Sequence, residues 1–134
     1  ITLAHSNEDG LFRNGAFTSV VAAGASAPCW STRVGKYVFT ANTASRTISR
    51  AISTGNHIFV DDTMAASIPS GGPSDIDADA GLMAVVDHAG GASHLTLLAY
   101  NRFGELSTVG AAVDLGASNA NGVAVVPAPD RDDD

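Results

Sequence analysis

The chain has 134 residues, a formal net charge of −7, and 45% hydrophobic against 16% charged residues. This length suits one domain with a real core, and the composition excludes an intrinsically disordered chain. An acidic surface repels phosphate backbones and anionic membranes, so we expect neither nucleic acid nor a membrane as a partner.

The residue pattern predicts an all-β protein. Apolar residues do not recur at helical spacing; instead, short runs of β-branched and aromatic residues alternate with Gly, Pro, Asn, Asp and Ser. The 14 glycines fit the many turns that such a fold needs. The expected strands are 1–4, 17–22, 29–33, 37–41, 47–51, 58–60, 74–76, 82–86, 95–100, 106–113 and 122–126.

An internal repeat organises these strands. The segment that begins at Pro28 aligns with the segment that begins at Pro73, 45 positions later, and Gly35 aligns with Gly81, 46 positions later. Residues 47–50 then align with 95–98, and a third register begins at 121. Each repeat contains short predicted strands, and a turn with a Gly-x-apolar sequence follows them. A period in the mid-forties with about four strands in each period is typical of β-propeller blades.

The strand count predicts an incomplete β-propeller of about two to three four-stranded blades over residues 1–126, followed by an acidic tail at 127–134. In this interpretation, 1–4 is the last strand of one blade and 122–126 is the first strand of another. Closed propellers usually have about four to eight blades. We therefore expect the chain to pair with copies of itself, to pair with another chain, or to close in a different, sandwich-like way.

Three segments resemble a known family: Ala-Pro-Cys-Trp at 27–30, Gly-Lys-Tyr-Val-Phe-Thr-Ala-Asn-Thr at 35–43, and Thr-Ile-Ser-Arg at 47–50. They are similar to blades of the lactonase-type seven-bladed β-propellers, which include 6-phosphogluconolactonase-like and carboxymuconate-cyclase-like proteins. Residues 77–81 and 95–106 continue the pattern. The resemblance implies the C-terminal blades of such a propeller. The catalytic and substrate-binding groups of the family have no residue-by-residue match here, so the catalytic residues are unknown.

Two groups of side chains invite a metal interpretation. Asp75, Asp77 and Asp79 alternate as in a calcium loop, but the Gly and Glu that an EF-hand needs at its sixth and twelfth positions are missing. His88 and His94 flank a Gly-rich turn and could converge with Asp87 on a metal ion, although exposed turn histidines are more common.

His57 with Asp61 and Asp62 is a weaker metal candidate than either of these groups. The chain also lacks phosphate-cradling loops, haem motifs and nicotinamide fingerprints. We predict no metal site and no cofactor.

Other residue types also have two interpretations. Cys29, the only cysteine, is predicted to be a buried small hydrophobe. Four arginines could bind an anionic group, but we favour surface positions for them. Four aromatic residues could stack on sugars, but we favour a core between blades. The arginines are Arg33, Arg46, Arg50 and Arg102, and the aromatic residues are Trp30, Tyr37, Phe39 and Tyr100.

The function expected from these patterns is that of a non-catalytic propeller segment. It would act as a structural or interaction subunit that docks on a partner protein chain, such as a secreted enzyme, because open strand edges and apolar faces need cover. One alternative is a piece or subunit of a lactonase-like hydrolase, with Arg50 or His88 required for activity. A second is a self-assembled, lectin-like ring. Secretion is expected from a start at Ile1 rather than at Met and from the family resemblance.

Overall fold

The computed structural model describes residues 2–5, 8–13, 16–20, 23–55 and 57–126, so the predicted acidic tail at 127–134 lies outside the described residues. The described residues form strands and turns only, which confirms the predicted all-β class, and none of their segments is a helix that could cross a membrane. The strands are β1 (Thr2–His5), β2 (Glu8–Arg13), β3 (Ala16–Val20), β4 (Pro28–Val34), β5 (Tyr37–Asn42), β6 (Thr47–Thr54), β7 (His57–Ser67), β8 (Gly72–Asp79), β9 (Leu82–Ala89), β10 (Ala92–Tyr100), β11 (Leu106–Thr108) and β12 (Val113–Asp114).

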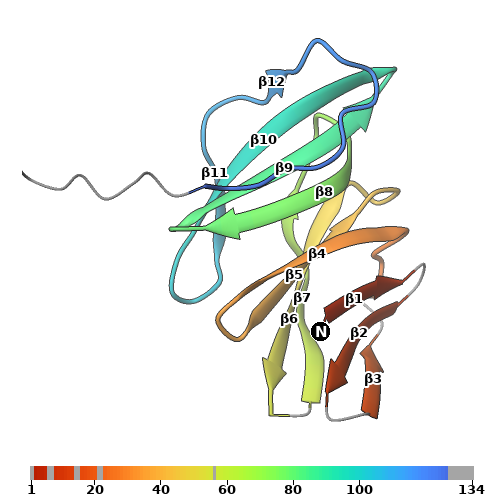
Figure 1. The fold of residues 1–134 in the computed structure, drawn as a ribbon, viewed down its shortest axis with the longest axis vertical. Helices are drawn as coiled ribbons and strands as arrows, with labels where there is room; N and C mark the ends of the chain where they lie inside the picture. The colour runs from red at the N-terminus through yellow and green to blue at the C-terminus, as the bar shows by residue number, and fades with distance from the viewer. Residues whose placement is uncertain (1, 6–7, 14–15, 21–22, 56, 127–134) are drawn as a thin grey trace, which may run out of the picture.

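The strands form antiparallel sheets that follow one another along the chain (Figure 1). The first sheet has the order β1-β2-β3, the second β4-β5-β6-β7, and the third β11-β10-β9-β8 with β12 also on β10. None of these sheets is closed. The first strands of neighbouring sheets lie against each other, because β1 contacts β4 and β4 contacts β8.

The second and third sheets repeat the same irregularity at the start of their first strands. The register of β4 against β5 shifts between Pro28 and Trp30, and that of β8 against β9 shifts between Pro73 and Asp75. A bulge of this kind adds one residue to one strand and re-aims nearby side chains. The aligned prolines of the sequence repeat are therefore structurally equivalent, 45 positions apart.

The first turn of each sheet corrects the sequence alignment. The pairs that close the two turns are Val34 with Tyr37 and Asp79 with Leu82. Gly35 is thus equivalent to Ala80 and not to Gly81, and the offset stays at 45 where we aligned the glycines at 46. Ala80 and Gly81 have φ values of 49° and 86°, as a two-residue turn with both residues left-handed requires. Matching the glycines misplaced the repeat by one residue.

The main core lies between the second and third sheets. Phe39 and Ala41 project from one face of β5, while Val38 projects from the opposite face and packs with Ala51 and Ile58. Side chains alternate along a strand, so β5 is buried on both faces, as a middle sheet must be. The buried residues of the main core are Phe39, Ala41, Ile48, Ile68, Ile76, Met83, Val85 and Leu98.

The N-terminal segment departs from the expected strand pattern. β2 has no counterpart among the expected strands, because Glu, Asp and Gly at its start have low β-propensity. Pairing with β1 on one side and β3 on the other overrides that local preference. In addition, the segment at 1–4 was interpreted as the last strand of a blade, but β1 begins its sheet and contacts β4.

The segment 106–113, expected to be one strand, is divided into β11 and β12. Both pair with β10, Thr108 opposite Leu98 and Val113 opposite Leu95. These two pairs are three residues apart on β10 but five apart on the outer segment, so the outer segment holds two extra residues there, and Gly110 within it has a φ of 69°. A left-handed glycine interrupts the extended backbone there, so the third sheet has two short edge strands in place of the long β7.

Candidate functional site

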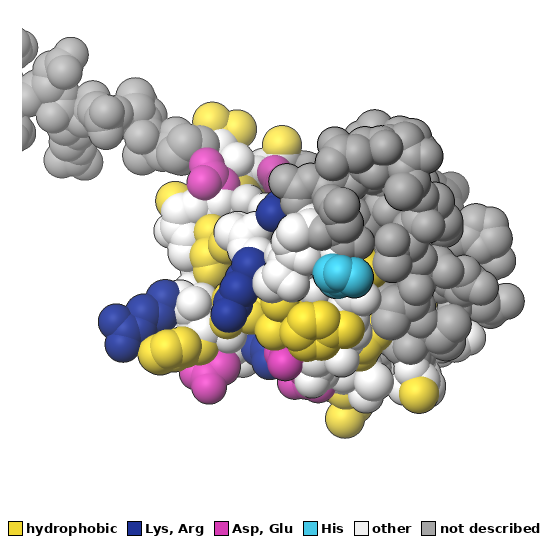
Figure 2. Space-filling view, turned by 90° about the horizontal axis from the view of Figure 1, so that it is seen from below, with side chains coloured by type: hydrophobic (Ala, Val, Ile, Leu, Met, Phe, Trp, Pro, Cys, Tyr) yellow, Lys and Arg dark blue, Asp and Glu magenta, His cyan; other side chains and the backbone are white. Residues whose placement is uncertain are grey.

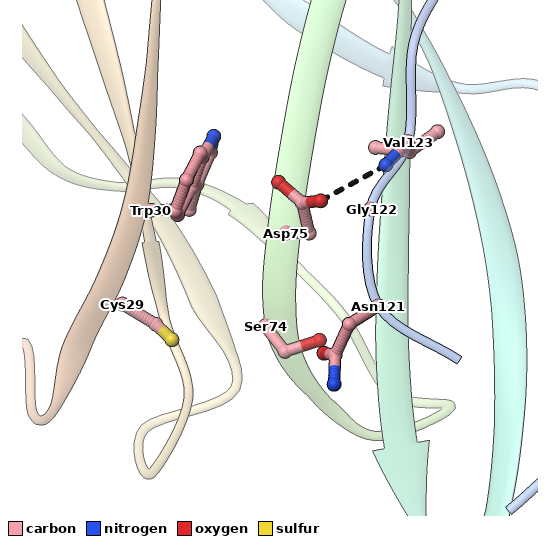
Figure 3. Close-up of a pocket in the computed structure, with 7 residues that line it drawn as sticks. All are labelled: Cys29, Trp30, Ser74, Asp75, Asn121, Gly122 and Val123. Atoms are coloured by element: carbon pink, nitrogen blue, oxygen red, sulfur yellow. Dashed lines mark hydrogen bonds between the residues drawn. The ribbon is translucent and has the colours of Figure 1, made fainter. Parts of the chain in front are cut away.

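A pocket forms where the first strands of the second and third sheets meet a later extended segment (Figure 3). Its volume is about 530 Å³. Its residues come from matching positions of the sequence repeat, since Cys29 and Ser74 are 45 positions apart and Asn121 follows Ser74 by 47. The lining residues are Cys29, Trp30, Ser74, Asp75, Asn121, Gly122 and Val123. The pocket therefore exists only when the repeats stack.

The third wall of the pocket belongs to residues 122–126, which we expected to form a strand. They run alongside β8 but are not part of its ladder (Figure 1). The backbone N–H of Val123 donates to Asp75 Oδ2 at 2.9 Å, and that of Val125 donates to Asp77 Oδ2 at 2.8 Å. Carboxylates at alternate positions of β8 thus take the place of backbone carbonyls, which is why the predicted strand is absent.

The three alternating aspartates do not converge on a cation. The carboxylate of Asp75, which is 8% exposed, also accepts the N–H of Ile76 at Oδ1, 2.8 Å away. Asp79 Oδ1 accepts the N–H of Ala80 at 2.8 Å. Each carboxylate is therefore bound to backbone donors. No group of three or more His, Cys, Asp or Glu in the described ranges could hold a metal ion.

A chain of hydrogen bonds leads from the pocket wall into the third sheet. His88 Nε2 lies 2.8 Å from Ser74 Oγ, and His88 Nδ1 lies 3.0 Å from Oγ of the fully buried Ser93. Ser93 Oγ accepts the N–H of Ala120 at 3.0 Å. If Nε2 is unprotonated, it can accept the proton of the Ser74 hydroxyl, as a general base does. If Nε2 carries the proton, Ser74 instead donates to the carbonyl of Val86, 3.4 Å away.

His88 and His94 lie on opposite faces of the β9–β10 hairpin. His88 pairs with Ser93 and His94 with Asp87, and neighbouring pairs of a ladder point to opposite sides. His94 Nδ1 is 3.2 Å from Oδ1 of the fully buried Asp87. Asp87 Oδ2 accepts hydrogen bonds from Ser70 and Thr96. His88 and His94 therefore do not converge with Asp87, although His94 contacts it, and both histidines are half-buried where we favoured exposed turn positions.

The aromatic residues and the cysteine divide between core and pocket. Phe39 is fully buried, and Tyr37 and Tyr100 are half-buried against the same core, as predicted. Trp30 is 55% exposed and Cys29 is also exposed, so the predictions that they are buried were wrong. Both follow Pro28 at the bulge of β4, where the register shift leaves them on the pocket wall.

Arg50 is an inter-sheet contact and not the surface residue that we predicted. Its Nη1 donates to the carbonyl of Gly104 at 2.6 Å, and its Nε donates to Asp61 Oδ2 at 2.7 Å. Its guanidinium also lies 5.4 Å from the centre of the Tyr37 ring. Arg50 therefore joins the second sheet to the connection between β10 and β11, and it is not one of the residues that line the pocket.

The other three arginines are exposed, as predicted. Arg33 Nε donates to the carbonyl of Gly35, and Arg102 lies over the ring of Phe103 with 4.6 Å from guanidinium to ring centre. Arg46 is exposed as well, with a positive φ of 56°. Viewed from below, cationic and hydrophobic side chains lie side by side (Figure 2). His57 is exposed too, so it forms no buried site with Asp61 and Asp62.

Comparison with known proteins assigns no family to the chain. No family model, curated protein or solved structure matches it. The function is therefore inferred from the geometry of the pocket and of the stacked sheets.

Proposed function

We propose that this chain is a β-propeller-type segment without catalytic activity of its own, and that it is a structural or interaction subunit that docks on another protein chain. The observation that carries the proposal is the position of residues 122–126. Asn121 follows Ser74 by 47 positions, close to the 45 by which Ser74 follows Cys29, and Asp75 and Asp77 hold residues 122–126 beside β8. Within the described ranges, no strand pairs with their backbone.

The outer side of this segment is apolar and open. Val126 is 80% exposed, and Ala124 is exposed as well. An extended segment without strand partners is a template for backbone pairing with another chain. A partner strand laid along 122–126 would cover the valine and supply the backbone hydrogen bonds of a next sheet.

The propeller interpretation has three supports. The equivalent bulges lie 45 residues apart, the second and third sheets are meanders, and their first strands lie against each other. These features are those of blades arranged around an axis. The resemblance to lactonase-type propellers agrees with them and favours a secreted partner.

The test is the mass of the native particle by light scattering, with intact-mass analysis of each chain in it. We expect a second, different chain. Val126→Arg should abolish that association, whereas Val109→Arg, a matched change at a residue 43% exposed on the edge of the third sheet, should leave it intact. A stable monomer would refute the proposal, and a ring of identical chains would replace it with the lectin-like alternative.

A second candidate function, hydrolysis of an ester or lactone, is favoured by one observation. Ser74 lines the pocket, and its hydroxyl lies 2.8 Å from His88 Nε2. A serine hydroxyl beside an imidazole base is the arrangement that activates a nucleophile. Hydrolysis of a simple aryl ester that is lost in both Ser74→Ala and His88→Gln, but kept in Ser107→Ala, would support it. Equal rates in all of these proteins would end it.

A further inference from the structure

We infer that the pocket between Trp30 and Asp75 binds a small organic cation, an alkylammonium group. The proposed docking function does not require this ligand, so cation binding and docking are tested independently. The inference starts from an aromatic face and a carboxylate on opposite walls of one pocket. Figure 3 shows the Trp30 ring on β4 facing Asp75 on β8 across that space.

Trp30 supplies the aromatic wall. Among aromatic side chains, tryptophan attracts a cation most strongly, because the face of its indole ring carries negative potential. More than half of its surface is exposed, although a large aromatic residue is normally buried when the core has room for it. The bulge of β4 holds it on the pocket wall, so a ligand can reach the ring.

Asp75 supplies the charge. Its carboxylate is 8% exposed and is held by two backbone donors, Ile76 N–H at Oδ1 and Val123 N–H at Oδ2. A carboxylate has about four acceptor positions, so one further acceptor position remains on each oxygen. Two backbone bonds fix its orientation, and partial burial strengthens its attraction for a cation.

The other wall residues favour a cation over an anion or a sugar. No Lys or Arg, which an anion would need, is among the described residues that line the pocket. The hydroxyl of Ser74 is already engaged with His88 and Val86, which leaves the Asn121 amide as the one other uncharged amide or hydroxyl side chain of the described lining for a sugar. Val123 and Cys29 add apolar surface that suits alkyl groups. The net charge of −7 raises the local concentration of any cation.

The single tryptophan makes the test direct, because all indole fluorescence of this chain comes from the pocket wall. The native protein is titrated with tetramethylammonium chloride, and in parallel with tert-butanol, which is similar in shape but uncharged. We expect a saturable change in emission with the cation, and binding of the alcohol at least about tenfold weaker. High salt should weaken binding of the cation.

Asp75→Asn has a matched control in Asp77→Asn. Both aspartates are on β8 and both accept one backbone N–H of the 122–126 segment, but only Asp75 lines the pocket. We expect Asp75→Asn to lower the affinity for tetramethylammonium about tenfold or more, and Asp77→Asn to leave it nearly unchanged.

Cys29 gives a readout that does not depend on Trp30. It is the only cysteine, it is exposed, and it lines the same pocket, so bound tetramethylammonium should slow its alkylation. In Trp30→Leu this protection should disappear while the free thiol still reacts. The inference is overturned by the absence of saturation, by equal binding of tert-butanol, by equal affinities of the two aspartate variants, or by methyl glucoside binding in place of the cation.

Discussion

Asn42 and Asp87 occupy the same place in two successive sheets, 45 positions apart, and each is bound to the side chain at the same place on the next strand. Asn42 Nδ2 donates to Ser49 Oγ at 3.1 Å, and Thr96 Oγ1 donates to Asp87 Oδ2 at 3.0 Å. Both residues are buried. A buried polar side chain needs a hydrogen-bond partner. At this position one sheet meets that need with an amide and the other with a carboxylate.

Asp87→Ala should lower the free energy of unfolding by about 1–3 kcal/mol, because it removes the carboxylate that accepts from the buried Thr96 hydroxyl and the half-buried Ser70 hydroxyl. Asp87→Asn should cost less, since an amide oxygen still accepts one of these bonds and Asn42 shows that an amide fits this place. Urea unfolding followed by circular dichroism measures both. Ser107→Ala, at an exposed position, serves as the control, and equal losses in Asp87→Ala and this control would contradict the assignment.

Gly104→Ala should be more destabilising than Gly110→Ala. Both glycines have a positive φ, 72° and 69°, so each substitution costs about 1–2 kcal/mol of backbone strain. Only at Gly104 would the new Cβ also lie 2.9 Å from the Tyr37 ring, which adds about 1–3 kcal/mol of overpacking. Thermal unfolding of the two variants under identical conditions compares them. The same loss of stability in both would mean that Tyr37 moves away freely.

Arg50→Lys should destabilise the contact between the second and third sheets by about 1–3 kcal/mol, because an ammonium cannot reach both Asp61 and the Gly104 carbonyl with the geometry of a guanidinium. Arg102→Lys, at an exposed position, should change stability by less than about 0.5 kcal/mol. The free energies of unfolding from urea titrations test the pair. No difference between them would show that Arg50 contributes no more than a surface cation.

Hydrogen exchange should detect the two carboxylate contacts of the 122–126 segment. The amides of Val123 and Val125 are hydrogen-bonded to Asp75 and Asp77, so they should exchange more slowly than the amide of Ala124 between them. Asp75→Ala should speed exchange at Val123 by about tenfold or more, with a smaller effect at Val125. Exchange rates by NMR give this pattern directly, and uniform rates over the three residues would contradict it.

Much of the strand pattern was predictable because local sequence carries it. The segments around Tyr37, Leu82 and Leu95 combine β-branched and aromatic residues with bounding glycines, and each is a strand. The segment at 8–13 was missed for the opposite reason, since its acidic and glycine residues form a strand only with partners on both sides. Local preference is a weak guide when pairing on two sides supplies the backbone hydrogen bonds.

The candidate site was less predictable, as Trp30 and His88 show. We predicted Trp30 to be a core residue, and for His88 we favoured an exposed turn position over a metal site with His94. The structure places Trp30 on the wall of an open pocket and His88 against Ser74, 14 positions away in the chain. Sequence spacing indicates on which side of a strand a residue lies, but the neighbour that it meets there belongs to another segment.

By itself, the sequence determined the all-β class and the repeat of about 45 residues, because turn residues and β-forming runs act locally and recur along the chain. Only the tertiary structure decided that Asp75 and Asp77 bind the amides of Val123 and Val125, and that the bulge of β4 exposes Trp30. These contacts join segments as far as 48 positions apart. Their partners are chosen by how the sheets stack, and no local pattern records that choice.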